Sequence, residues 1–212
     1  MFFKPMPIFI SVVTFVVVVR VLIKKNDNGY DKAVDNFLDK EEKANKTNKD
    51  FDELNLHFVS PAKNLPFKEY ETIPQYKNLI KKQNFVKRKI KLDIIKIPSN
   101  LTNTELKEMY GANNFKKISI LEEHYNSYVR GLYEWALELY NVNNIYDCKQ
   151  VLLEAIRLEA NISDVYCLLA KIYKKENDKQ KLINLRDSVY NINLSLKEST
   201  IKKIDEIINN LI

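Results

Sequence analysis

Apolar residues recur at helical spacing along most of this chain, and the longest apolar run comes first. Residues 6–23, MPIFISVVTFVVVVRVLI, hold thirteen Val, Ile, Leu or Phe residues in eighteen positions. A helix of this length spans roughly 27 Å, close to the hydrocarbon thickness of a bilayer. Arg20 lies near one end of the run, where its long side chain can reach the headgroups. The pattern predicts one transmembrane helix over residues 6–23.

The alternative for this run is a cleaved signal peptide, which has basic residues before the apolar run and a small-residue cleavage site after it. Here Arg20, Lys24 and Lys25 come at the end of the run or just after it, so we predict an uncleaved anchor over residues 1–25. Positive charge favours the cytoplasmic side of a membrane. The expected protein is therefore single-pass, with its C-terminal part in the cytoplasm.

Residues 26–74 change pattern twice. Helical spacing predicts a short amphipathic helix at Tyr30, Ala33, Val34, Phe37, Leu38 and Glu41. The segment DKEEKANKTNKD, residues 39–50, then has no large apolar side chain and is typical of a linker. From residue 51 to residue 74, prolines alternate with aromatic residues, which predicts an extended strap lying on a folded surface.

Residues 75–212 return to the helical period. A helix is predicted over residues 76–97, with its apolar face made by Tyr76, Leu79, Ile80, Val86, Ile90, Ile94 and Ile97. A capping box at Thr102 and Glu105 predicts a short helix that ends near Gly111. The same signature at Ser119 and Glu122 predicts the start of a long, deeply packed helix that runs to residue 140.

Two consecutive segments share one order of small and large apolar residues. The first has Leu132, Trp135, Ala136 and Leu139, a turn at Asn143, then Cys148, Leu152, Ala155 and Ile156. The second has Tyr166, Leu169, Ala170 and Tyr173, a turn at Asn177, then Leu182, Arg186 and Val189. This pattern resembles the tetratricopeptide repeat, a helix-turn-helix unit of 34 residues. The resemblance places repeats at about 129–162 and 163–194.

The predicted fold is therefore all-α. A short solenoid of tetratricopeptide-like helix pairs occupies residues 75–212, preceded by one transmembrane helix and a mostly extended linker over residues 26–74. A third capping signature, at Ser195 and Glu198, predicts a terminal capping helix over residues 195–212. Because such arrays usually need three repeats to bury a continuous core, the upstream helices are expected to pack as non-standard repeats.

The resemblance also implies a concave surface that holds a peptide or a helix of a partner protein. In the register above, its side chains would be Arg130, Tyr133, Leu137 and Tyr140 from the first repeat and Lys171 and Lys174 from the second. The family's carboxylate-gripping version is not expected, because Tyr133 and Leu137 occupy two of its positions. A groove that merely packs the chain's own strap or its N-terminal helix remains the alternative.

Charge adds a second candidate surface. The chain has a formal net charge of +6, and residues 77–96 alone carry eight basic residues and one acidic residue. The candidate basic surface consists of Lys81, Lys82, Lys87, Arg88, Lys89 and Lys91. Such a stretch is a solvated face, a contact for anionic lipid headgroups or an acidic partner, or, as a third choice, a nucleic-acid site.

Catalytic chemistry has little support in these residues. The two histidines, His57 and His124, have no cysteine at a metal-ligand or triad spacing, and Cys148 and Cys167 form no zinc or redox motif. The three glycines form no phosphate-binding loop. We predict no catalytic residue, metal or cofactor. The expected function is that of a membrane-anchored scaffold or adaptor, with a lipid- or nucleic-acid-binding module and an enzyme of no recognisable motif as the alternatives.

Overall fold

The computed structural model describes residues 7–98 and 100–211, with the backbone alone for residues 7–13 and 23–29. Every regular element in these ranges is helical, so the all-α prediction is confirmed. The chain forms two compact units, residues 1–54 with 101–115, and residues 55–100 with 116–212.

The predicted transmembrane helix requires a correction. The helix α1 (Pro7–Lys46) continues through the segment predicted as a linker, up to residue 46. Of the predicted span 6–23, residue 6 and the side chains of 7–13 and 23 lie outside the described residues. Within the described part of the chain, no helix has a stretch that is both long and apolar enough to cross a membrane. This finding contradicts the single-pass span and the membrane localisation inferred from it.

The first unit joins the end of α1 to the short helix α3 (Asn103–Tyr110) and the 3-10 turn η2 (Ala112–Asn114). The predicted capping box is confirmed: the Thr102 hydroxyl accepts from the amide of Glu105, whose carboxylate accepts from the Thr102 amide. Gly111 has a φ of 86°. A Cβ at this position would lie 2.8 Å from the backbone nitrogen of Lys49, so only glycine allows this approach.

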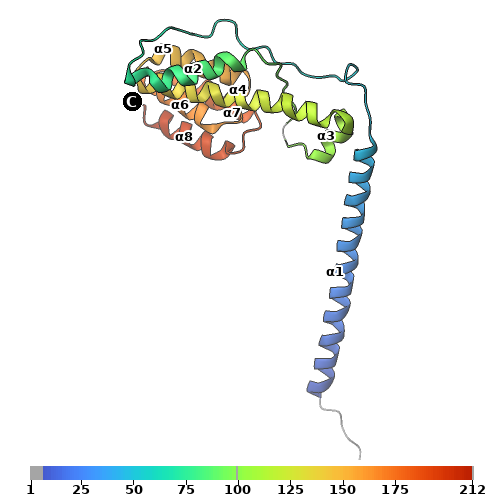
Figure 1. The fold of residues 1–212 in the computed structure, drawn as a ribbon. Helices are drawn as coiled ribbons and strands as arrows, with labels where there is room; N and C mark the ends of the chain where they lie inside the picture. Colours follow the sequence, from blue (N-terminus) through green and yellow to red (C-terminus); the bar gives the residue numbers. More distant parts are fainter. Residues whose placement is uncertain (1–6, 99, 212) are drawn as a thin grey trace, which may run out of the picture. The chain divides into compact units, whose positions relative to one another are not determined.

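The second unit is a layered helical array, drawn from green to red in Figure 1. Its helices are α2 (Lys77–Lys89), α4 (Phe115–Asn141), α5 (Ile145–Arg157), α6 (Ser163–Lys175), α7 (Lys179–Tyr190) and α8 (Lys197–Asn209), with a 3-10 turn η1 (Pro74–Tyr76) before α2. Consecutive helices from α5 to α8 are in contact, and α6 also contacts α8. One apolar core runs through the unit and includes Trp135, Leu152, Leu169 and Ile204, each fully buried.

The turns between paired helices recur at an interval of 34 residues. Asn143 and Asn177 both have positive φ, 59° and 53°. Each is followed by an N-cap residue, Asn144 or Asp178, whose side chain accepts from the amide three positions later. The same backbone bonds close both turns, 2.9 Å from the amide of Asn144 to the Leu139 carbonyl and 3.0 Å in the second copy. The turn between α4 and α5 and the turn between α6 and α7 are therefore built alike.

Three predicted helix ends differ from the structure. α2 ends at Lys89 instead of continuing to residue 97, and the chain then runs extended, with a β-bridge between Ile95 and Phe58. α4 begins at Phe115, so Ser119 lies inside the helix and caps nothing. α8 has Leu196 at its N-cap without a side-chain cap, because the Ser195 amide and hydroxyl instead donate to Asn161.

Candidate partner-binding groove

The predicted groove residues of α4 and α6 lie side by side in the middle of the array. Tyr133 is half-buried, and its pKa is raised by burial and then by the nearby charge of Asp164 and by Cys167. Arg130 and Ile162 line one cavity, and the Lys175 ammonium lies 4.6 Å from the ring centre of Tyr140. These pairs recur along the two helices in the same order, so α4 and α6 run in parallel and form one face, which we call the groove.

The C-terminal helix adds a wall that the sequence analysis missed. A cavity of about 290 Å³ lies between α6 and α8, and its lining residues are Cys167, Lys171, Lys174, Lys203, Ile204, Glu206, Ile207 and Asn210. Helical spacing could have indicated this wall. α8 buries its face with Ile201, Ile204 and Ile208, which leaves Lys203 and Ile207 on the adjoining side.

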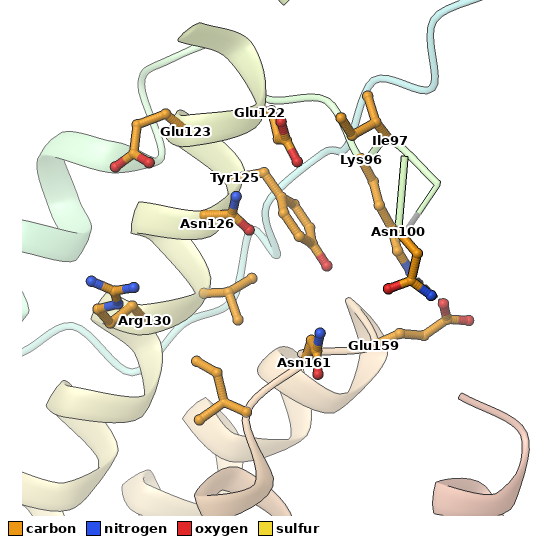
Figure 2. Close-up of a pocket in the computed structure, with 12 residues that line it drawn as sticks. Lys96, Ile97, Asn100, Glu122, Glu123, Tyr125, Asn126, Arg130, Glu159 and Asn161 are labelled. Atoms are coloured by element: carbon orange, nitrogen blue, oxygen red, sulfur yellow. Dashed lines mark hydrogen bonds and ion pairs between the residues drawn. The ribbon is translucent and has the colours of Figure 1, made fainter. Parts of the chain in front are cut away.

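A second cavity of about 410 Å³ lies between α4, the residues Lys96, Ile97 and Asn100, and the turn that joins α5 to α6. Figure 2 shows Arg130 and Asn126 on the α4 side of this cavity, and Lys96, Asn100 and Glu159 together on the opposite side. Arg130, which the sequence places in the groove, thus stands where the groove meets this cavity. Glu122 and Glu123 also line it, so the groove extends along α4 into a region that holds more carboxylates than cations.

Inside this cavity, local bonds fix the floor and one wall. The Tyr125 hydroxyl donates to the Leu158 carbonyl at 2.6 Å, and burial raises the pKa of Tyr125 to about 12. Lys96 forms an ion pair with Glu159. The Glu122 carboxylate points towards the Tyr125 ring (Figure 2) and has no cation partner among the described residues. Burial, and then the charge of Glu123, raise the pKa of Glu122 above its usual 4.5.

A different side of the array holds the strap, which we define in the structure as residues 55–73. Gln83 of α2 is buried and forms two hydrogen bonds with the backbone of Lys68. It accepts from the Lys68 amide at 3.1 Å and donates to the Lys68 carbonyl at 2.7 Å. Phe67 stacks on Trp135, with ring centres 4.9 Å apart and planes 5° apart. The strap therefore covers α4 at Trp135, beside α2.

Two buried carboxylates of α5 hold the same strap. Glu154 accepts from the amide of Ala62 at 2.8 Å and from the Tyr128 hydroxyl at 3.3 Å, and Arg157 neutralises it at 2.7 Å. Asp147 forms an ion pair with the Lys68 ammonium. Because burying a carboxylate is costly unless it is paired and hydrogen-bonded, each of these groups specifies where the strap must lie.

The candidate basic surface is only partly available. The Lys82 ammonium lies 2.7 Å from Glu134 of α4, and Lys87 lies over the Phe67 ring of the strap at 5.4 Å. Arg88 and Lys89 flank the Phe85 ring at 6.0 and 5.4 Å. Lys81 and Lys91 are exposed, and Lys91 lies beyond the end of α2. The six residues therefore do not form one continuous cationic face.

The described part of the chain has no cluster of metal ligands, and its buried cysteine is unreactive. No group of three or more His, Cys, Asp or Glu side chains there could hold a metal ion. Cys148 is buried in the core, which raises the pKa of its thiol to about 12 and makes it a poor nucleophile. His124 contacts the Asp93 carbonyl through Nδ1 at 2.9 Å.

Comparison of the chain with protein-family models, with curated protein sequences and with solved structures finds no match.

Proposed function

We propose that this chain is a protein-interaction scaffold or adaptor that binds a segment of a partner polypeptide in the groove formed by α4, α6 and α8. The observation that carries the proposal is the cavity of about 290 Å³ between α6 and α8, whose lining residue Cys167 lies near the half-buried Tyr133 of α4. Ligand pockets for small molecules usually start at about 300 Å³. This cavity suits one anchoring side chain of a longer segment better than a whole cofactor.

The placement of the strap supports this choice. Its contacts are with α2, with Trp135 of α4 and with Asp147 and Glu154 of α5. Its anchors use none of the predicted groove residues, so the alternative that the groove merely packs the strap is disfavoured. The 34-residue recurrence of the turns and the resemblance to tetratricopeptide repeats add support. In such an array the first helices of successive pairs, here α4 and α6, share one face.

The test compares two tyrosines on different faces. A photo-crosslinking amino acid replaces Tyr140, half-buried in the groove, or Tyr146, which is 69% exposed on α5. The adduct is identified, and the protein in it is purified and titrated against the wild type, Tyr140→Ala and Tyr146→Ala. We expect an adduct specific to position 140 and a weaker affinity for Tyr140→Ala alone. Equal adducts at both positions, or no binding by the purified protein, contradict the proposal.

A further inference from the structure

The two ends of the groove carry opposite charges. At the α6–α8 end, Lys171 and Lys174 lie one turn apart on α6, and Lys203 faces them from α8. All three are exposed, and none forms an ion pair or hydrogen bond with another described residue. Glu206 is the single acidic residue that lines this cavity. Three ammonium groups therefore face one carboxylate, an arrangement that favours an anionic ligand.

Other lysines of the array behave differently. Lys149 of α5 pairs with Glu176, and Lys181 of α7 pairs with Asp178. Local carboxylates thus neutralise these two lysines, whereas the lysines around the α6–α8 cavity keep their charge for a ligand. The floor of this cavity is apolar, with Ile204 buried and Ile207 half-buried. The site combines an apolar seat for one side chain with a cationic rim.

The opposite end has the reverse balance. Lys96 and Glu159 neutralise one another, which leaves Glu122 and Glu123 against Arg130. Glu122 is the half-buried carboxylate that points towards the Tyr125 side chain in Figure 2. An ammonium or guanidinium group placed there would meet a carboxylate next to an aromatic side chain, a combination that attracts cations.

We infer that the partner segment is dipolar and binds in one direction, with its acidic residues over Lys171, Lys174 and Lys203 and a basic residue in the Glu122 cavity. This inference rests on the proposed function. Exposed charge pairs are individually weak, but pairs of opposite sign at the two ends discriminate between orientations, because the reversed segment would meet like charges at both ends. The groove would therefore select the order of charges and not only the net charge.

The probe is a random peptide library displayed on phage and selected against the purified full chain. Selected peptides are synthesised and titrated by fluorescence anisotropy, and each is compared with a peptide of the same composition in which the order of the charged residues is reversed. The lysine-site variant carries Lys171→Glu, Lys174→Glu and Lys203→Glu. The control variant makes the same change of charge at the exposed lysines Lys63, Lys77 and Lys179, which do not line the groove. Circular dichroism and Trp135 fluorescence verify that each variant is folded.

We expect peptides with acidic residues towards one end and a basic residue towards the other. Their affinity should fall by about tenfold or more in the lysine-site variant and hold in the control variant. Peptides whose acidic residues are replaced by lysine should regain affinity for the lysine-site variant, which mere damage to the fold cannot produce. Reversing the charge order should weaken binding to the wild type.

Two negative results are distinct. Peptides that lose affinity with Tyr140→Ala but bind equally in both charge orders, or are indifferent to the lysine-site variant, overturn the dipolar inference and leave the proposed function standing. If no selected peptide depends on Tyr140, the proposed function fails and the inference falls with it.

Discussion

The stacking of Phe67 on Trp135 offers a sharp test of how the strap is held. Phe67 lies parallel to the indole at 4.9 Å, and Trp135 is fully buried beneath it. Replacing a fully buried phenylalanine by alanine costs about 3–5 kcal/mol. Phe67 is half-buried, which lowers that figure, whereas the stacked pair adds about 0.5–1.5 kcal/mol. We expect Phe67→Ala to lower the free energy of unfolding of the second unit by about 2–3 kcal/mol.

Because the chain has a single tryptophan, its fluorescence reports on this position alone. A loss of 2–3 kcal/mol should lower the melting temperature by about 5–10 °C in a unit of this size. In the folded variant the indole loses its cover, so its emission should shift to longer wavelength and acrylamide should quench it more strongly. The emission wavelength and the acrylamide quenching can both be measured on the same sample.

Phe58→Ala is the matched control. Phe58 belongs to the same strap but is 54% exposed, and its bridge to Ile95 uses backbone atoms only. We expect its free energy of unfolding to stay within about 0.5 kcal/mol of the wild-type value and its emission to be unchanged. Equal effects of the two substitutions, or an unshifted emission in Phe67→Ala, would refute the view that the strap is anchored through this stack.

Three further substitutions or reactions test local features. Because burial raises the pKa of Glu122 in the folded chain, ionisation costs stability as the pH rises from below 4.5 through the raised value. Glu122→Gln should thus raise the melting temperature at pH 7 and not at pH 4, unlike Glu198→Gln on the exposed start of α8. Asn143 has a φ of 59°, so Asn143→Ala should destabilise the second unit by about 1–2 kcal/mol and Asn143→Gly by much less, as urea titrations would show. In the native chain at pH 8, iodoacetamide should label Cys167 before Cys148, because Cys148 is fully buried and has a pKa of about 12.

The helix pairs were predictable because their local signals agree with their packing. Trp135, Ala136, Cys148 and Leu152 occupy interior positions of the repeat pattern, and all four are fully buried. Asn143, expected in the turn, has the positive φ that asparagine tolerates well. Where small and large apolar residues alternate at helical spacing, few other arrangements would bury them all.

Arg186 stands where the repeat pattern has an aromatic residue, and the structure shows what replaces the aromatic contact. Its guanidinium reaches Asp205 of α8 at 3.3 Å and Asp187 at 2.9 Å. An ion pair thus joins α7 to α8 at this position. The sequence contains both partners, but their spacing of 19 residues matches no helical or strand period. Such a contact follows only once the two helices are known to be neighbours.

The end of α2 was mispredicted because a periodic pattern can continue past the helix that it began. Ile90, Ile94 and Ile97 keep helical spacing, yet the helix ends at Lys89. Ile94 and Ile95 are both buried although they are adjacent, which suits an extended segment enclosed on two sides. The backbone confirms this, since the Val59 amide donates to the Ile94 carbonyl at 2.9 Å. The strap, distant in sequence, decides the conformation of this segment.

The location of usable positive charge also depends on tertiary contacts. By sequence, residues 77–96 hold the densest basic run, but Glu134 and the rings of Phe67 and Phe85 occupy four of its cations. A cation engaged in this way gains less from a new ligand, because binding must first break or weaken an existing contact. Lys171 and Lys174 are neighbours on α6, and Lys203, some thirty residues later, joins them only when α6 packs against α8. A cluster of cations can therefore be assembled by the packing of two helices as well as by a basic run in the sequence.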